Sequence, residues 1–359
     1  MDFEARQKRL VDSAEADAVA IIPGANLTYY TGLHFHLSER PTLALFTKQG
    51  PAIIIPALEI PVINQRQDLE FRVFSWTDAD GFAGAFQRAI KEMGLTNIAV
   101  DGQTMRVFEY LALQQGGAQT LMDMGKELLH LRASKTEDEI DAMREAIKLS
   151  QDALDDLLKW VTPGKTEREI ADKLNQLVKE HGSEGFAFEA LIQTGVNSGV
   201  PHGAVSDRVL QENEFLLIDY GGKKRDYPAD ITRTFCIGQP TDEMQRIYDI
   251  VLAANQAGIA AVKPGIPASA VDKATRDVIE AAGYGEYFIH RTGHGLGLEV
   301  HELPQISSSN DALLEEGMVF TIEPGIYLPQ LGGVRIEDNV VVRANGAEVL
   351  TSYPYKLEI

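Results

Sequence analysis

The segment IDYGGKKRDYPADITRTF, residues 218 to 235, places two acidic residues beside apolar runs. Asp219 follows the apolar run 215–218, and Asp230 precedes Ile231. The β-branched and aromatic residues on either side predict strands over 215–219 and 231–237. Because carboxylates are rarely buried unless they are paired or bind a metal, two of them beside predicted core strands need an explanation.

A second segment repeats this arrangement. FTIEPGIYLPQLGGVRIEDNVVV, residues 320 to 342, has Glu323 after the apolar run 319–322 and Glu337 after 334–336. These runs predict strands over 319–322 and 334–342. Any one of the acids could be a strand-end carboxylate that faces water. Four acids in a repeated arrangement instead favour one shared site, in which two divalent cations would balance charges that otherwise repel.

The helices around these strands also occur twice. Ser134 and Glu137 have capping-box spacing at the start of a predicted helix, which ends at Pro163 and Gly164. Further helices are predicted over 167–180, 244–262 and 268–282. Two helices followed by two acid-bearing strands therefore appear twice. This predicts an internal duplication that brings the two strand pairs together around a pseudo-twofold axis.

The preceding part of the chain has a different pattern. Predicted helices over 6–16 and 82–93 alternate with predicted strands over 18–22, 42–47, 52–55 and 97–100. This order predicts an α/β domain with a mixed sheet over residues 1–126, followed by a second domain over 127–359. Within the first domain, the segment YYTGLHFH at 29–36 either covers an active site or is a surface loop that carries aromatic residues.

The composition excludes several classes of function. With 53 acidic and 33 basic residues, the chain has a formal net charge of −20, which opposes binding to nucleic acid or to an anionic membrane. Its single cysteine, Cys236, permits no intramolecular disulfide and lies in an apolar run typical of the core. The first ten residues lack the apolar segment of a signal peptide, and no apolar run reaches membrane-spanning length. We therefore expect a cytoplasmic protein.

A histidine-rich segment supplies nitrogen donors. HRTGHGLGLEVHELP, residues 290 to 304, contains His290, His294 and His301, three of the eight histidines of the chain. Glycines at 293, 295 and 297 would let the backbone approach another group closely. The segment could be a flexible surface loop, but the combination of histidines and glycines favours a metal site.

At this point a family resemblance is evident. Five residues lie within the motifs LIDYGG, YPADITRTF, GHGLGLEVHELP, TIEPGIY and GGVRIEDN, and these are Asp219, Asp230, His294, Glu323 and Glu337. The set closely resembles that of the pita-bread metallopeptidases, and among them aminopeptidase P and prolidase (Xaa-Pro dipeptidase). The resemblance implies an α+β fold, with a duplicated pita-bread catalytic domain over 127–359 preceded by a creatinase-like N-terminal domain over 1–126.

The resemblance also implies roles for individual residues. Asp219 and Asp230 would bind one metal ion, Asp230 and Glu337 would bridge to a second, and His294 and Glu323 would complete the second site. Two divalent ions are expected, Mn²⁺ first, with Co²⁺, Zn²⁺ or Fe²⁺ as alternatives. The other site residues that the resemblance implies are His202 at the reacting carbonyl, His290 and His301 near the scissile bond, and Tyr327 and Arg335 beside the ligands.

The activity implied is hydrolysis of an Xaa-Pro bond by a hydroxide that bridges the metals, in short proline-containing peptides or in dipeptides, by an enzyme expected to be a homodimer. A dipeptidase needs a cation for the free carboxylate of its substrate. No arginine or lysine lies between His301 and Glu323, which favours aminopeptidase P, although Arg291 or Arg40 could supply the cation. A creatinase-like metal-free hydrolase and a non-enzymatic peptide-binding scaffold are the alternatives. The intact set of acids argues against both.

Overall fold

A computed structural model describes residues 2–66 and 68–359. It contains two compact units, Met1–Arg132 and Ala133–Ile359. The division falls after Arg132 and not after residue 126, because the intervening residues are tied to the first unit. Arg132 Nη1 donates to Asn26 Oδ1 (2.9 Å), and the Tyr29 hydroxyl donates to the Leu131 carbonyl (3.3 Å).

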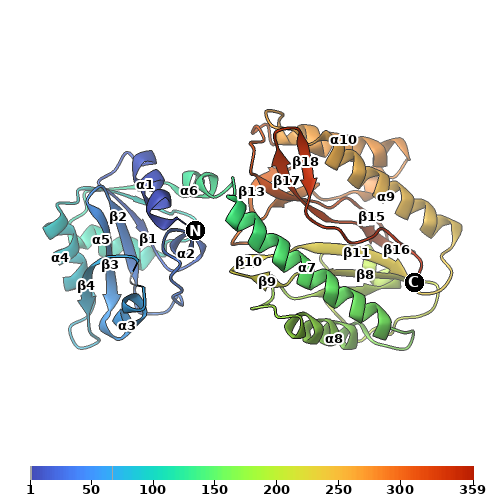
Figure 1. The fold of residues 1–359 in the computed structure, drawn as a ribbon, viewed down its shortest axis with the longest axis horizontal. Coiled ribbons are helices and arrows are strands. Elements are labelled where there is room, and N and C mark those ends of the chain that lie inside the picture. Colours follow the sequence, from blue (N-terminus) through green and yellow to red (C-terminus); the bar gives the residue numbers. More distant parts are fainter. Residues whose placement is uncertain (1, 67) are drawn as a thin grey trace. The chain divides into compact units, whose positions relative to one another are not determined.

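The first unit is built on one mixed sheet, in the order β4-β3-β2-β1-β5-β6 (Figure 1). β1 is antiparallel to β2 and parallel to β5, so the predicted mixed sheet is confirmed. The strands are β1 (Ala18–Ile21), β2 (Leu43–Thr47), β3 (Gly50–Pro56), β4 (Arg72–Trp76), β5 (Asn97–Val100) and β6 (Thr120–Asp123). The helices are α1 (Phe3–Ser13), α2 (Ala25–Thr31), η1 (Ala57–Glu59), α3 (Ile60–Asn64), α4 (Ala83–Met93), α5 (Val107–Gly116) and α6 (Gly125–Leu131).

Alternate residues of a strand point to opposite faces of its sheet. Every residue of the central strands β1 and β2 is buried, so both faces of the sheet are covered there. Ala18 and Leu45 share a hydrophobic cluster with Phe86 of α4 and Leu113 of α5. On α2, Tyr29 and Tyr30 are each about 1% exposed. These two tyrosines are therefore core residues of the first unit and not part of a surface loop.

The second unit carries the acid-bearing segments. Its helices are α7 (Glu137–Trp160), α8 (Glu167–Glu180), η2 (Gly195–Gly199), α9 (Asp242–Ala261), α10 (Ala268–Ala281) and η3 (Gly285–Tyr287). Its first strands are β7 (Leu191–Thr194), β8 (Phe215–Tyr220), β9 (Lys223–Lys224), β10 (Tyr227–Pro228) and β11 (Ile231–Cys236). The later strands are β12 (Gly293–Gly295), β13 (Glu302–Ile306), β14 (Val319–Ile322), β15 (Gly325–Leu328), β16 (Gly332–Arg335), β17 (Asp338–Arg343) and β18 (Gly346–Val349).

The duplication expected from the sequence is visible in this unit. Helices α7 and α8 precede the sheet β11-β8-β7, and α9 and α10 precede the sheet β13-β12-β14-β17-β18 (Figure 1). Matching backbone hydrogen bonds occur at corresponding positions of the two copies. Gly164 N donates to Leu210 O (2.9 Å) just before α8, and Gly265 N donates to Leu314 O (2.8 Å) just before α10.

The helix cap predicted at Ser134 is wrong. The first helix of the second unit has Thr136 as its N-cap, and Glu139 completes the capping box. The sequence contains two overlapping candidates with the same spacing. Ser134 instead forms a β-bridge with Met318, which takes it out of the helix.

The single strand predicted over 334–342 is also wrong. It is divided into β16, which pairs with β15, and β17, which pairs with β14. Glu337 lies in the break, and its backbone N–H donates to Thr232 O in the other copy (3.1 Å). Because the pairing strand changes at this point, Glu337 belongs to neither of the two β-ladders.

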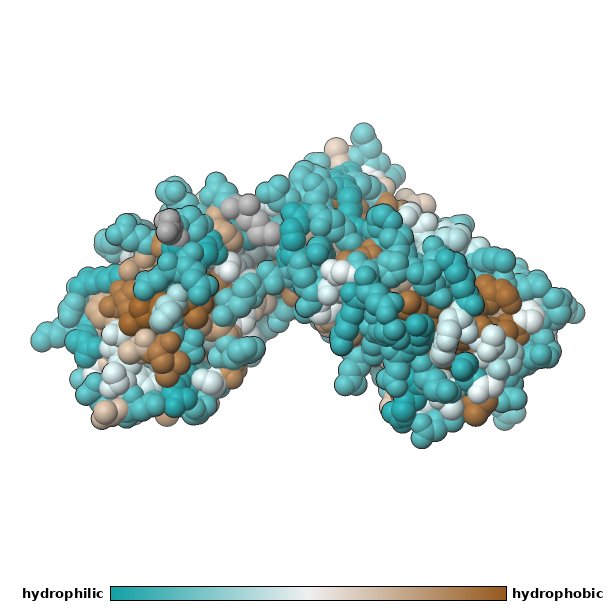
Figure 2. Space-filling view, turned by 60° about the horizontal axis from the view of Figure 1, so that its bottom comes forward, coloured by the Kyte–Doolittle hydropathy of each residue, from teal (hydrophilic) through white to brown (hydrophobic). Residues whose placement is uncertain are grey.

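The surface agrees with the acidic composition. Figure 2 shows mainly hydrophilic residues on the visible face of each unit, with small hydrophobic patches between them. Cys236 is buried, as predicted. Among residues 2–66 and 68–359, we find no helix with both the length and the apolar character needed to cross a membrane.

Candidate metal centre and active site

The antiparallel pair β8–β11 brings the first two acids together. Asp219 lies directly opposite Thr232 in the ladder, and Asp230 is two residues before Thr232. Residues opposite one another share a face, as do residues two apart on one strand. Asp219 and Asp230 are therefore presented on the same face of the sheet, at the end where the two strands separate.

The second copy presents its acids in a related way. Ile322 and Asp338 are the last residues paired between β14 and β17, and Glu323 and Glu337 occupy the next position of each chain segment. The Thr232 hydroxyl from the first copy donates to Glu337 Oε2 (2.6 Å). This bond holds an acid of the second copy against the strand that follows Asp230.

His294 completes the group. Its Nε2 lies 3.5 Å from Asp230 Oδ2 and 3.4 Å from Glu323 Oε1, and its Nδ1 lies 3.2 Å from the Gly295 carbonyl. A carbonyl can only accept a hydrogen bond, so Nδ1 carries the proton and Nε2 keeps its lone pair. This is the tautomer in which Nε2 can bind a metal ion.

The glycines around His294 allow close packing of strands. A Cβ on Gly293 would lie 1.8 Å from the Thr321 carbonyl oxygen, and one on Gly295 would lie 2.1 Å from the Leu303 carbonyl oxygen. The predicted close approach is confirmed, and the groups approached are the neighbouring strands β14 and β13. The glycines thus let β12 fit between two strands with His294 directed at the acids.

The acids of this group destabilise one another's charged forms. Burial raises the pKa of Asp230 well above its ordinary value, with the charges of Glu337 and Asp219 adding to the effect. Burial likewise raises the pKa of Glu337, followed by the charges of Glu323 and Asp219, and it raises the pKa of Glu323 to about 7. Asp219 contributes to all three shifts, so its carboxylate belongs to the same cluster.

These residues fit a divalent cation. Ligand atoms of Asp230, His294 and Glu337 lie within 4.8 Å of one another. Asp219 Oδ1 is buried with no hydrogen-bond partner in the described structure, although such atoms are nearly always paired. Burial lowers the pKa of His294 to about 3, so this ring is neutral and available as a ligand at neutral pH. A set of buried carboxylates and one imidazole suits hard or borderline metal ions.

A chain of hydrogen bonds runs from the acids to His290. Arg335 bonds Asp219 through Nη2, and its Nη1 donates to the Tyr327 hydroxyl (3.0 Å). The Tyr327 hydroxyl lies 2.8 Å from His290 Nε2, and His290 Nδ1 lies 2.7 Å from the Arg291 carbonyl. Since that carbonyl can only accept, Nδ1 is protonated and Tyr327 donates to Nε2. Burial lowers the pKa of His290 to about 4, in agreement with a neutral ring.

The other two predicted histidines face the same site. His301 contacts His294 edge to face, with ring centroids 4.3 Å apart. The pKa of His301 is lowered by burial, then by the charges of Arg291 and His202. His202 also lowers the pKa of His290. His202 is exposed, on the segment that follows η2, and its charge acts on both His290 and His301.

Three polar residues around the acids were not predicted. Thr232 bonds Glu337, the Thr321 hydroxyl donates to Glu323 Oε1 (3.2 Å), and the side chain of Asn339 bonds the backbone of Asp230. Both threonines are two residues from an acid of the cluster, so the two-residue period of a strand could have identified them. Asn339 is likewise two residues from Glu337, but the acid whose backbone it bonds, Asp230, lies in the other copy.

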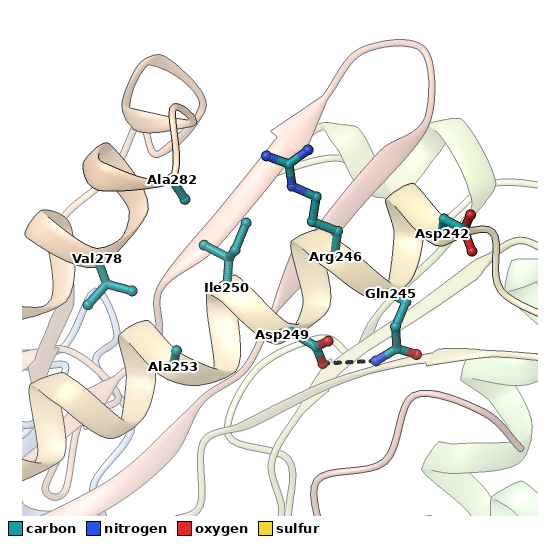
Figure 3. Close-up of a pocket in the computed structure, with 8 residues that line it drawn as sticks. All are labelled: Asp242, Gln245, Arg246, Asp249, Ile250, Ala253, Val278 and Ala282. Carbon is teal, nitrogen blue, oxygen red and sulfur yellow. Dashed lines mark hydrogen bonds between the residues drawn. The ribbon is translucent and has the colours of Figure 1, made fainter.

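A separate groove lies on the outer helices of the second unit. It has a volume of about 600 Å³ and is lined by Asp242, Gln245, Arg246, Asp249, Ile250, Ala253, Val278 and Ala282. Figure 3 shows these side chains on α9 and α10, with Gln245 donating to Asp249 (2.8 Å). None of the clustered acids or histidines lines this groove.

Comparisons with known proteins agree with this geometry. Residues 141–344 match the model of metallopeptidase family M24, and residues 5–134 match that of the creatinase/prolidase N-terminal domain. An "uncharacterized peptidase" of Staphylococcus epidermidis is 35% identical over 348 residues, which cover 96% of this chain and 97% of the relative. A second one, from Staphylococcus haemolyticus, is 37% identical over 341 residues, which cover 94% and 95%.

Solved structures show the same fold. A dipeptidase from Pyrococcus horikoshii OT3 is 36% identical with a TM-score of 0.92, and 100% of each chain is covered. An Xaa-Pro dipeptidase from Bacillus anthracis is 31% identical with a TM-score of 0.91, and 99% of each chain is covered. An X-Pro aminopeptidase from Thermotoga maritima MSB8 is 32% identical with a TM-score of 0.89, over 99% of this chain and 100% of that one. The pita-bread fold predicted from the sequence is confirmed, and the chain belongs to metallopeptidase family M24.

Proposed function

We propose that this family M24 peptidase is a dinuclear metal-dependent exopeptidase that hydrolyses the bond between an N-terminal residue and proline. The observation that carries the proposal is the buried group of Asp230, His294 and Glu337, joined by the partly buried Asp219 and Glu323, in which one Asp219 carboxylate oxygen has no partner in the described structure. The similar solved structures described as Xaa-Pro dipeptidase and X-Pro aminopeptidase support the choice of bond.

The ligands divide between two ions. Asp219 and Asp230 would hold one ion, Asp230 and Glu337 would be shared, and His294 and Glu323 would complete the second. Mn²⁺ is our first choice because carboxylates dominate the set, with Co²⁺, Zn²⁺ or Fe²⁺ as alternatives. When bound, such a pair of ions lowers the pKa of a water molecule and polarises the substrate carbonyl.

The protein groups supply proton transfer and charge stabilisation. Glu323 would accept a proton from the attacking water and pass it to the proline nitrogen as that nitrogen leaves. His202 would donate to the oxyanion that forms on the substrate carbonyl. Burial keeps His290 neutral and the Tyr327 hydroxyl bonds its Nε2, so its ring can lie against a substrate without adding a charge.

Arg291 gives the site a cation for a free carboxylate. Its Nη1 bonds Gln305 Oε1, and its charge adds to burial in lowering the pKa of His294 and His301 and opposes the burial that raises the pKa of Glu323. The other arginine considered from the sequence, Arg40, is already bonded to Glu39 and Asp78. A guanidinium binds a carboxylate strongly, so Arg291 supports activity on Xaa-Pro dipeptides in addition to longer peptides.

Hydrolysis of defined peptides tests the proposal. The purified protein should cleave Ala-Pro and Ala-Pro-Gly with added Mn²⁺, should leave Ala-Ala uncleaved, and should lose activity in EDTA. Metal analysis should find more than one ion per chain at saturation. Cleavage that persists after complete metal removal would support a creatinase-like hydrolase. Bound metal without cleavage of any Xaa-Pro peptide would contradict the proposed bond specificity.

A further inference from the structure

One buried acid outside the metal cluster has no role in the chemistry described above. Glu167 is the first residue of α8 and its side chain is fully buried, whereas Glu169, two residues later, is exposed. Acids are rarely buried without partners. The partners of Glu167 all lie on the segment that carries His202.

The Glu167 carboxylate accepts five hydrogen bonds from this segment. Oε1 accepts from the Thr194 N–H (2.8 Å), the Thr194 hydroxyl (3.1 Å) and Asn197 Nδ2 (3.0 Å). Oε2 accepts from the Ser206 N–H (3.0 Å) and the Ser206 hydroxyl (2.6 Å). Thr194 and Asn197 precede His202, and Ser206 follows it, so one side chain fastens both ends of the segment.

His202 lies between the two ends of the segment that Glu167 bonds. His202 is exposed, so burial does not hold its ring. Its segment contains only the short η2 between the end of β7 and the start of β8. By contrast, the metal-ligating acids lie on or next to paired strands, which fix them independently of Glu167.

We propose that Glu167 is a positioning residue for His202, and that it fixes the segment 194–206 so that the imidazole reaches the reacting carbonyl. The catalytic part of this proposal rests on the proposed function. A displacement of about 1 Å in a catalytic group can lower a rate by about a hundredfold. A Gln side chain has the same shape as Glu, but either orientation of its amide places the NH₂ group against a backbone N–H, that of Thr194 or that of Ser206, so Glu167→Gln should loosen the segment.

Activity measurements separate positioning from general damage. Glu167→Gln should lower kcat by about tenfold or more with little change in KM and an unchanged metal content. Glu169→Gln is the matched control, because it alters the exposed acid of the same helix turn, and it should keep full activity. Glu167→Asp keeps the carboxylate and should retain more activity than Glu167→Gln. It also serves as the test variant if Glu167→Gln does not fold.

A double variant tests whether Glu167 acts through His202. In a His202→Ala background, Glu167→Gln should reduce kcat by less than about twofold, because the residue that it positions is already absent. If the double variant instead loses kcat by the product of the two single-variant factors, the proposal is overturned.

Hydrogen exchange provides a readout that does not depend on activity. Amides of 194–206 should exchange faster in Glu167→Gln than in the parent and in Glu169→Gln, while peptides containing Asp219, Asp230 and Glu337 remain unchanged. Unchanged exchange over 194–206 would overturn the proposal. If the parent protein fails to cleave Xaa-Pro peptides, the proposed function fails, and the exchange data still decide whether Glu167 anchors the segment.

Discussion

Arg335 connects the acid cluster to the histidines at the scale of single residues. Its guanidinium is buried and contacts Asp219, Thr232 and Tyr327 at the same time. Its charge lowers the pKa of Asp230, Glu323 and Glu337, although burial outweighs that effect in each case. Arg335 therefore compensates part of the acid charge, and the unpaired oxygen of Asp219 is left for a metal ion.

The Tyr327 hydroxyl bonds Nε2 of His290, and its removal gives the first prediction. Tyr327→Phe removes the donor to His290 Nε2 and the acceptor for Arg335. We expect kcat for Ala-Pro to fall by about tenfold, while the metal content stays the same because the ligands are untouched. Steady-state kinetics and metal analysis on one preparation check this. Loss of bound metal in the variant would show that Tyr327 supports the ligands instead.

We expect Arg291 to bind the free carboxylate of a dipeptide substrate, and this gives the second prediction. Arg291→Gln should raise KM for Ala-Pro by about tenfold or more, because a charge-assisted hydrogen bond is lost. Ala-Pro-amide, which has no carboxylate on its proline, should show little change in KM. Arg246→Gln, on the outer surface of α9, is the control and should behave as the parent. An equal effect on both substrates would mean that Arg291 does not bind the carboxylate.

The ligand candidates could be predicted from the sequence because each lies in a short motif. Asp219, Asp230, Glu323 and Glu337 all follow or precede apolar runs, and His294 lies among glycines. Glu167 could not be predicted, because it resembles any acid at the start of a helix until its five partners are seen. Its role depends on contacts between segments that are distant in sequence, which no local pattern encodes.

At the scale of elements, the first helix of the second unit, α7, begins after its N-cap Thr136. The helix itself could be predicted from the helical spacing of its apolar residues, because that spacing places them on one face that can be buried. The spacing could not choose between Ser134 and Thr136, because that choice depends on the pairing of Ser134 with Met318. The division of the strand at Glu337 was missed for the same reason, because the break is made by a bond to Thr232 in the other copy.

The observed cap gives the third prediction. Thr136→Ala should lower the free energy of unfolding by about 1 kcal/mol, because the capping box with Glu139 is lost. Ser134→Ala is the matched control and should change the free energy of unfolding by less than about 0.5 kcal/mol. Urea denaturation followed by circular dichroism measures both. If Ser134→Ala lowered the free energy of unfolding more than Thr136→Ala does, Ser134 would be the cap, as the sequence alone suggested.

At the scale of the whole molecule, the two copies of the catalytic unit contribute different parts of one site. The first copy provides Asp219 and Asp230, and the second provides His294, Glu323 and Glu337. The backbone bond from Glu337 to Thr232 and the side-chain bonds from Asn339 to Asp230 join the copies at this point. The group of Asp230, His294 and Glu337 that could hold a metal ion draws on both copies, so it forms only when both are folded together.

This arrangement links metal binding, pH and stability, and gives the fourth prediction. Burial and mutual repulsion raise the folded-state pKa of Asp230, Glu323 and Glu337, with Glu323 at about 7. For metal-free protein, the stabilisation from the raised pKa of Glu323 is complete at low pH and is lost as the pH rises through about 7, and the raised pKa values of Asp230 and Glu337 act in the same direction. A metal ion must displace the same protons before it binds, so it binds weakly at pH 5.5 and well at pH 8.

The rise in melting temperature on adding Mn²⁺ should therefore be larger at pH 8 than at pH 5.5. Differential scanning fluorimetry of chelator-treated protein, with and without the ion, measures this rise. NaCl at the same ionic strength is the control and should give no such difference. His294 does not oppose the trend, because burial lowers its pKa to about 3 and it is neutral at both pH values. An equal rise at both pH values would mean that the acids are already ionised before the metal arrives, and that the cluster is more hydrated than its burial implies.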